Sequence, residues 1–282
     1  MSDSLEGKVA LITGGSQGIG RAVSTALAQK GMNLVLAARS KDKLDVAAEE
    51  LRRIGVRVLT VPTDVSKRAD LEHLVAAAVA EFGGIDVLVN NAGIESFRVF
   101  HEMPIELIEA TVQTNTIGTL LLTRLVIPVM KKKGWGRIIN MASTAAIQSP
   151  PYGAAYAATK ASILQFTMAL RLECFGSGIS ATAICPGFTE DGGIYETIKH
   201  EMGKGVPWLL RGTNAETVAK KVIKALRTDP PIIIVDRPGA RAFFIVASLF
   251  PRFGEWVSRK VALRYFRRLA TQRDEGDSTP PQ

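Results

Sequence analysis

The chain has 282 residues, of which 46% are hydrophobic and 22% charged, with two cysteines and three histidines. This length fits one large domain or two modest ones, and the balance of residue types excludes collagen-like and wholly disordered chains. Two cysteines are too few for a secreted disulfide scaffold, and the histidines lack the spacing of a zinc site. We therefore expect a metal-free globular protein of a reducing compartment.

The net charge of +8 is concentrated near the end of the chain. Residues 237–273 hold nine lysines and arginines against one acid, whereas residues 1–236 carry a net +3 and residues 274–282 carry −3. A short basic segment indicates a membrane surface or an acidic partner, and we expect no nucleic-acid binding. The N-terminal residues include acids and no apolar stretch of the signal-peptide kind, so we expect a cytoplasmic protein.

Short apolar runs alternate with longer helical patterns along most of the chain. Most of the runs are continuously apolar, as in a parallel sheet that helices cover on both faces. The pattern predicts an α/β fold, a doubly wound sheet whose ligands bind at the carboxyl ends of its strands. We expect seven strands, at residues 8–13, 33–38, 56–61, 85–90, 137–141, 179–184 and 231–235, and helices that include 44–54, 71–82, 154–175 and 215–226.

The composition of the chain also predicts its division into parts. The main domain covers residues 1–236 and includes a glycine-rich lid at about 187–212. An amphipathic helical extension follows at 237–273. The last stretch, 274–282, combines acids, serine and prolines, and we expect a disordered tail there.

The first strand leads through a glycine-rich turn into a helix expected to end near Lys30. Glycines let the backbone approach a pyrophosphate, whose charge the unpaired N–H groups of a helix N-terminus stabilise. The alternative is a turn that serves only the packing of strand against helix. The residues expected to contact a dinucleotide in this turn are Gly14, Ser16, Gln17, Gly18, Ile19 and Gly20.

The end of the second strand bears on the choice between NAD(H) and NADP(H). An acid at this place binds a free ribose 2′-hydroxyl, but the chain has Ala37-Ala38-Arg39-Ser40, without a carboxylate. Arg39 can instead pair with a 2′-phosphate, which favours NADP(H). The alternative is that Arg39 is a solvated loop cation.

Five motifs occur in one order and spacing along the chain: Thr13-Gly14 with Gly18-Ile19-Gly20, Asn90-Asn91-Ala92-Gly93, Asn115, Ser143, and Tyr156-x-x-x-Lys160. Over residues 6–236 this set resembles the short-chain dehydrogenase/reductase family. The resemblance implies a Rossmann fold with a seven-stranded parallel sheet, hydride transfer between a nicotinamide and a carbonyl/alcohol pair, and assembly into homodimers or homotetramers.

Tyr156 and Lys160 are four residues apart and share one face of a predicted helix. The Lys160 ammonium and a positive oxidised nicotinamide would both favour the phenolate, which makes Tyr156 a suitable general acid and base. Ser143 would hydrogen-bond the reacting oxygen. By the resemblance, Asn115 would hold a water between Lys160 and solvent; the alternative is an asparagine that binds only backbone groups.

The resemblance implies further cofactor contacts. Asp64 and Val65 would lie at the adenine, and the turn after the sixth strand would lie at the nicotinamide. Where the family usually has a threonine this chain has Asp191, so Thr189 is the candidate for that contact. The remaining cofactor candidates are Asn91, Ala92, Gly93, Pro186 and Gly187.

The lid contains apolar residues, among which Tyr195 and Trp208 are the candidates for substrate contact. Their presence favours a lipophilic carbonyl compound of the steroid, terpenoid or long-chain type, unless they only pack the lid onto the core. The leading function is therefore an NADP(H)-dependent oxidoreductase of a lipophilic carbonyl/alcohol pair. The alternatives are a reductase of 3-oxoacyl thioesters and, in another class, a non-catalytic NADP(H)-binding module at a membrane.

The C-terminal extension begins with an apolar run, 242–250, that is too short to span a bilayer. From Glu255 onward, the helical period separates four basic residues from apolar ones, as in an interfacial helix. We expect either a peripheral membrane contact or packing of this helix on its own or a neighbouring subunit. The basic residues are Lys260, Arg264, Arg267 and Arg268, and the apolar ones are Val261, Ala262, Tyr265, Phe266 and Leu269.

Overall fold

The computed structural model describes residues 4–189, 212–237 and 239–276. Within these ranges the strands form a single seven-stranded sheet of order β3-β2-β1-β4-β5-β6-β7, and every neighbouring pair is parallel. The predicted doubly wound α/β fold is thus confirmed. The strands are β1 (Val9–Thr13), β2 (Asn33–Ala38), β3 (Val58–Pro62), β4 (Val87–Asn90), β5 (Gly136–Met141), β6 (Ile179–Pro186) and β7 (Ile232–Val235).

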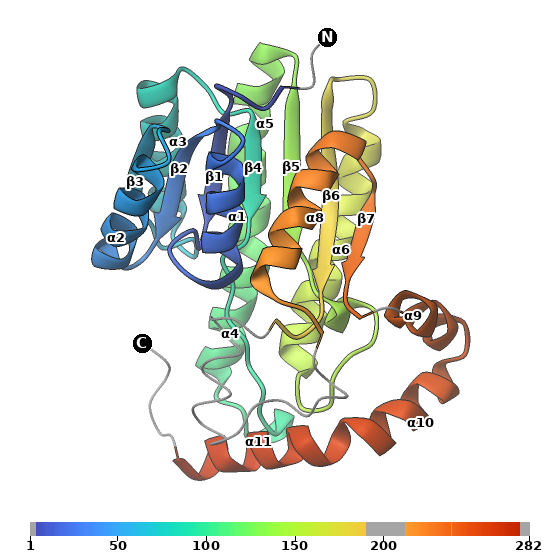
Figure 1. Cartoon of the computed structure of the whole chain (residues 1–282). Helices are drawn as coiled ribbons and strands as arrows, with labels where there is room; N and C mark the ends of the chain where they lie inside the picture. The colour runs from blue at the N-terminus through green and yellow to red at the C-terminus, as the bar shows by residue number, and fades with distance from the viewer. Residues whose placement is uncertain (1–3, 190–211, 238, 277–282) are drawn as a thin grey trace.

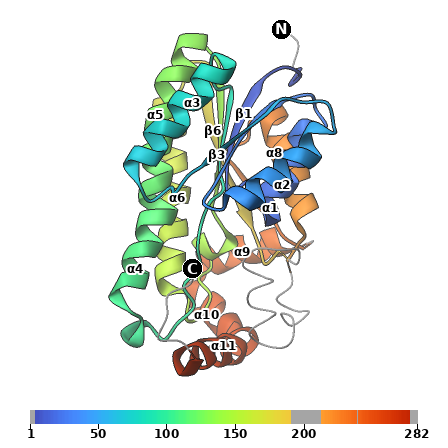
Figure 2. The ribbon, with the colours of Figure 1, turned by 90° about the vertical axis from the view of Figure 1, so that its left-hand side faces the viewer.

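Helices cover both faces of the sheet (Figures 1 and 2). One face carries α1 (Gly18–Ala28), α2 (Lys41–Arg52) and α8 (Ala215–Thr228). The other carries α3 (Arg68–Phe82), α5 (Gly118–Lys133) and α6 (Ala154–Glu173). Shorter elements between them are η1 (Phe100–Glu102), α4 (Ile105–Val112), η2 (Gln113–Ile117) and η3 (Thr144–Ala146).

The interior strand β1 shows why the apolar runs are continuous. Ala10 and Ile12 join the core under α1, α2 and α8, whereas Val9 and Leu11 join the core under α3, α5 and α6. Because helices cover both faces, all four side chains are buried. The connections reverse direction between β1 and β4, so that a crevice forms at the carboxyl ends of these two strands.

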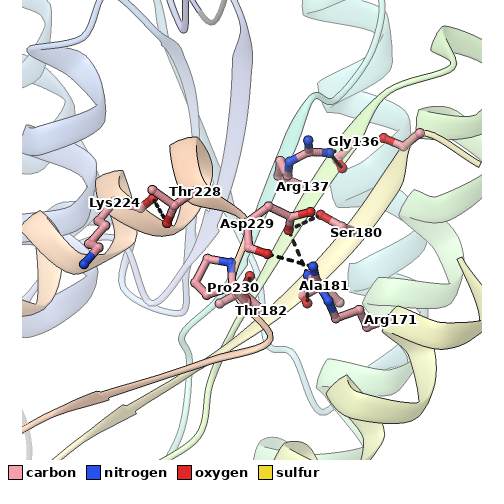
Figure 3. Close-up of polar contacts among 11 residues, drawn as sticks. Gly136, Arg137, Arg171, Ser180, Ala181, Thr182, Lys224, Thr228, Asp229 and Pro230 are labelled. Atoms are coloured by element: carbon pink, nitrogen blue, oxygen red, sulfur yellow. Dashed lines mark hydrogen bonds and ion pairs between the residues drawn. The ribbon is translucent and has the colours of Figure 1, made fainter. Parts of the chain in front are cut away.

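The opposite, amino-terminal edge of β5, β6 and β7 is held by a polar network around Asp229 (Figure 3). Asp229 follows α8 in the left-handed conformation, with φ +46°. Its carboxylate accepts hydrogen bonds from Arg171 at 2.8 Å and from Ser180 at 2.6 Å. Burial raises the pKa of Asp229, but these two hydrogen bonds and the positive charges of Arg171 and Arg137 together hold the pKa below its ordinary value. The network ties the α8–β7 turn to α6 and β6.

The C-terminal extension forms three helices, α9 (Ala240–Leu249), α10 (Pro251–Val261) and α11 (Leu263–Gly276), below the carboxyl ends of the strands (Figure 1). The continuous helix expected from Glu255 is interrupted at Ala262, where φ is −106°. Beyond this interruption, α11 packs across the end of the main domain (Figure 1). No helix in the described ranges is long and apolar enough to cross a bilayer.

The apolar side of α11 packs on the protein itself. Tyr265, Phe266 and Leu269 are buried and form a cluster with Phe97 of the main domain. The four basic residues expected on the other side, Lys260, Arg264, Arg267 and Arg268, are exposed. The helix α11 thus packs on its own subunit, which is one of the two arrangements expected from the sequence. Its buried apolar residues are not free to contact a membrane.

The helix α11 also continues through Gly276, three residues into the stretch expected to be a disordered tail. The side chain of Arg273 in its last turns is buried and ion-paired with Glu95. Once a helix is anchored, each further residue adds a backbone hydrogen bond at little cost. The acids that follow Arg273 therefore extend the helix instead of beginning a tail.

Candidate active site

A cleft of about 1870 Å³ opens at the carboxyl ends of the strands. Its volume exceeds the roughly 300–1,000 Å³ of a typical small-ligand pocket, as a site for a dinucleotide together with a second molecule requires. Most of the residues predicted from the sequence line it: Gly14, Ser16, Gln17, Gly18, Ile19, Arg39, Asp64, Val65, Asn91, Ala92, Gly93, Ser143, Tyr156, Lys160, Pro186, Gly187 and Thr189.

The glycine turn between β1 and α1 presents bare backbone to this cleft. Gly14 and Gly18 have φ values of +65° and +52°, which side-chain-bearing residues rarely adopt. Gly20 does not line the cleft; a Cβ there would collide with the carbonyl oxygen of Gly14. Gly20 thus lets α1 approach the turn. The open backbone and the helix N-terminus fit the pyrophosphate of a dinucleotide.

Thr13 joins the glycine turn to the loop after β4. Its hydroxyl oxygen accepts hydrogen bonds from the backbone N–H groups of Asn91 and Ala92, both at 3.0 Å. The Asn91 side chain donates in return to the carbonyl oxygens of Thr13 and Gly14. These bonds fix two walls of the cleft relative to each other, a role of Thr13 that local pattern does not show.

Two basic side chains lie at the end of β2. Arg39 and Lys43 both line the cleft there, and Lys43 was not among the predicted residues although it lies one helical turn beyond Ser40. Asp64 also lines the cleft, but its carboxylate accepts hydrogen bonds from the Ser66 backbone at 3.0 Å and hydroxyl at 2.7 Å. Burial raises the pKa of Asp64, but the bonds from Ser66 and the positive charges of Lys67 and Arg39 together hold the pKa below its ordinary value.

Tyr156 and Lys160 on α6 face Ser143, which follows β5. The Lys160 ammonium donates a hydrogen bond to the carbonyl oxygen of Met141 at 2.9 Å and lies 5.8 Å from the centre of the Tyr156 ring. The Ser143 hydroxyl oxygen accepts a hydrogen bond from the N–H of Ala145 at 3.1 Å. The three predicted catalytic side chains therefore meet in one wall of the cleft.

The pKa of Tyr156 differs from the expectation, which was a stabilised phenolate. Desolvation raises the pKa of Tyr156 to about 12, although a hydrogen bond with Ser143 opposes it; the negative charge of Glu95 adds to the rise. Burial lowers the pKa of Lys160 to about 8. In the protein alone the Tyr156 hydroxyl keeps its proton at neutral pH, which suits a proton donor.

Asn115 lies in the π-helical segment η2. Its side chain is buried and does not line the cleft. Its amide oxygen accepts a hydrogen bond from the Ile94 N–H, and its amide nitrogen donates to the Ile94 carbonyl, both at 2.8 Å. The amide nitrogen also donates to the Thr159 hydroxyl at 3.1 Å. Asn115 thus positions the loop after β4, and the water expected beside it stays a prediction.

An aromatic wall, made of Phe97, Phe188 and Phe266, lies beside the catalytic tyrosine. The Phe266 ring centre is 5.1 Å from that of Phe97 and 5.7 Å from that of Phe188. Phe97 in turn is 5.9 Å from the ring of Tyr156. All three phenylalanines line the cleft. They come from separate segments of the chain, so no local spacing could have identified them.

An ion pair holds the aromatic wall in place from the far end of α11. The two guanidinium nitrogens of Arg273 contact the two carboxylate oxygens of Glu95 at 2.6 and 2.8 Å, and both side chains are almost buried. Glu95 lies two residues before Phe97, and Arg273 lies two helical turns after Phe266. The pair therefore fixes α11 onto the loop after β4.

Two predicted substrate contacts, Tyr195 and Trp208, lie outside the described residues, as does most of the expected lid at 187–212. Of the described lid residues, Phe188 belongs to the aromatic wall and Thr189 forms an isolated parallel bridge with Thr213.

The lowered pKa of Lys160 predicts a stability effect that can be measured. Between pH 8 and 10 the native protein holds fewer protons on Lys160 than the unfolded chain, so this residue contributes stability that rises with pH. Relative to Lys160→Met, the wild-type free energy of unfolding should increase by about 2 kcal/mol over this range. Urea unfolding of both proteins across the pH range measures it, and a difference independent of pH would contradict the assignment.

Comparison with known proteins agrees with this geometry. A family model described as short chain dehydrogenase matches residues 8–202. A ketoacyl reductase, HetN, of a Nostoc species is 33% identical over 234 residues, which cover 83% of this chain and 80% of the relative.

Solved structures agree as well. A variant of actinorhodin polyketide ketoreductase, solved with NADPH, superposes with a TM-score of 0.74 at 32% identity, over 84% of this chain and 92% of that one. A short chain dehydrogenase/reductase from Burkholderia phymatum, solved with NAD, superposes with a TM-score of 0.79 at 27% identity, over 89% of this chain and 96% of that one. The chain therefore belongs to the short-chain dehydrogenase/reductase family and is an oxidoreductase of that family.

Proposed function

We propose that this protein is an NADP(H)-dependent oxidoreductase that interconverts a carbonyl and a secondary alcohol on a lipophilic substrate. The aromatic wall next to Tyr156 is the observation that carries the choice of substrate. Phe97 and Phe266 expose 3% and 1% of their surface, so they form a fixed apolar boundary at the reacting position. Such a boundary binds apolar rings and chains through burial and stacking.

The C-terminal helices extend this apolar boundary. Phe244 of α9, Val257 and Val261 of α10, and Ala262 after it all line the cleft. A steroid, a terpenoid or a long-chain ketone could bury most of its surface against these side chains, with its carbonyl oxygen at Ser143 and Tyr156. A small hydrophilic ketone would leave the same side chains in contact with water.

The catalytic wall suits reduction of the carbonyl. The glycine turn and the loop after β4 would hold the nicotinamide cofactor, which would supply the hydride. Tyr156 holds its proton at neutral pH and donates it to the substrate oxygen, while Ser143 hydrogen-bonds the same oxygen. Lys160, held by the Met141 carbonyl, places its ammonium where it stabilises the phenolate left behind.

The charges at the end of β2 support NADP(H) as the cofactor. Arg39 and Lys43 line the cleft next to Ala38, at the place where an NAD-binding protein carries an acid. A guanidinium and an ammonium together can neutralise a 2′-phosphate. The solved relatives include proteins with NADPH and with NAD, so the support comes from these residues of the chain.

A second candidate is the reduction of a 3-oxoacyl chain on a carrier protein or coenzyme A. The names of HetN and of the actinorhodin enzyme favour it. The exposed arginines of α11 would suit the acidic surface or phosphates of such a carrier.

A substrate panel tests the proposal. NADPH consumption is measured with hydrophobic cyclic ketones, with long-chain 3-oxoacyl thioesters and with small hydrophilic ketones. We expect the cyclic ketones to be reduced most efficiently and Tyr156→Phe to lose at least about 10²-fold in kcat, because the proton donor is removed. Retained NADPH binding by that variant is the control, and efficient reduction of thioesters alone would favour the second candidate.

The cofactor choice has a test of its own. The double substitution Ala38→Asp with Arg39→Ala should lower the ratio of kcat/KM for NADPH over NADH by about 100-fold. The new carboxylate would repel the 2′-phosphate, and the guanidinium proposed to pair with that phosphate would be absent. Arg53→Ala, which removes an exposed arginine directly after α2, is the matched control and should leave the ratio unchanged. An unaltered preference in the double variant would show that the phosphate binds elsewhere.

A further inference from the structure

The helices α9 and α10 expose large apolar side chains that the main domain does not cover. We call these residues the α9–α10 face: Ile245, Val246, Leu249, Phe250, Phe253 and Trp256, with exposed fractions of 50%, 41%, 68%, 63%, 41% and 59%. Single exposed apolar residues are ordinary, but six within twelve positions of a chain mark a contact surface.

The α9–α10 face is continuous across the two helices. The Phe253 ring centre lies 6.3 Å from that of Trp256 and 6.3 Å from that of Phe243 on α9. Gly254 allows close approach at the crossing, because a Cβ there would already lie 3.1 Å from the Cβ of Ala247. The two helices therefore present one surface and not two separate edges.

Exposed basic residues lie on the same two helices. Arg241, Arg252 and Lys260 are exposed, and none of the three has an ion-pair partner among the described residues. Glu255 is the sole acid of residues 237–273, and it pairs with Arg259 at 3.6 Å. Exposed apolar side chains together with basic residues are the composition of a helix that lies in the plane of a membrane interface.

We propose that the α9–α10 face docks on a lipid surface that carries anionic headgroups. A tryptophan at the edge of an apolar patch is typical of the membrane–water interface, and the arginines would meet the headgroups. A second copy of the chain is a poorer occupant, since a symmetric contact would bring the same unpaired cations together. At ten and eleven residues, the helices would lie on the bilayer without spanning it.

The other side of the same helices lines the cleft. Phe243 and Phe244 of α9 and Val257 and Val261 of α10 belong to its lining, and Phe243 touches Phe253 of the docking face. A membrane docked here would lie one helix away from the substrate site. Delivery of a lipophilic substrate from the bilayer would rest on the proposed function, whereas the docking itself does not.

Vesicle co-sedimentation of the full chain tests the docking. Vesicles with about 30% phosphatidylglycerol should bind the protein at least about tenfold more tightly than pure phosphatidylcholine, and about 1 M salt should weaken this binding. Phe253→Ser with Trp256→Ser should reduce binding by about tenfold or more. Leu172→Ser with Phe175→Ser is the matched control, because these residues are 76% and 91% exposed near the end of α6; this variant should bind as wild type does.

Far-UV circular dichroism and NADPH binding verify that each variant is folded, and sedimentation velocity reports its assembly. The proposal is overturned if anionic vesicles do not bind the wild type, or if both double variants bind them equally well. A change of oligomeric state in Phe253→Ser/Trp256→Ser, without vesicle binding by the wild type, would assign the face to a subunit contact instead. None of these readouts uses the substrate, so they are independent of the substrate panel.

Discussion

A nearly buried ion pair between Glu95 and Arg273 connects the end of the chain to the loop that follows β4. Removing one partner would leave an uncompensated charge in this environment, so the docked position of α11 requires both side chains. With α11 in place, Phe266 stacks on Phe97, and Phe97 lies against Tyr156. The extension therefore contributes Phe266 to the lining of the cleft that also contains Tyr156.

Burial also changes the acid–base properties of Tyr156 and Lys160. Desolvation keeps the proton on Tyr156 and makes the charge on Lys160 less favourable. A positive nicotinamide would shift both groups back toward phenolate and ammonium. Under the proposed function, the same burial would favour the protonated acid needed for reduction, and membership of the short-chain dehydrogenase family accounts for the oxidoreductase activity.

The fold and the cofactor half of the cleft could be predicted because their signals are local. Continuous apolar runs mark the strands, and the glycine turn and Tyr156-x-x-x-Lys160 are read within one element each. The substrate half could not be predicted, because Phe97, Phe188 and Phe266 meet only in the folded chain, and Glu95 and Arg273 are 178 residues apart. Helical periodicity correctly separated the basic and apolar sides of the extension, but it could not show that Ala262 breaks the helix or that the apolar side of α11 faces the protein.

The most direct measurement is a double-mutant cycle on Glu95 and Arg273, with KM for a hydrophobic ketone as the readout. If the ion pair holds the aromatic wall, Glu95→Gln and Arg273→Met should each raise KM by about tenfold, and the double variant should be no worse than either, which is a coupling of about 1.4 kcal/mol. Single variants with unchanged KM, or effects that simply add, would contradict the claim that this ion pair makes the C-terminal helix a wall of the active site.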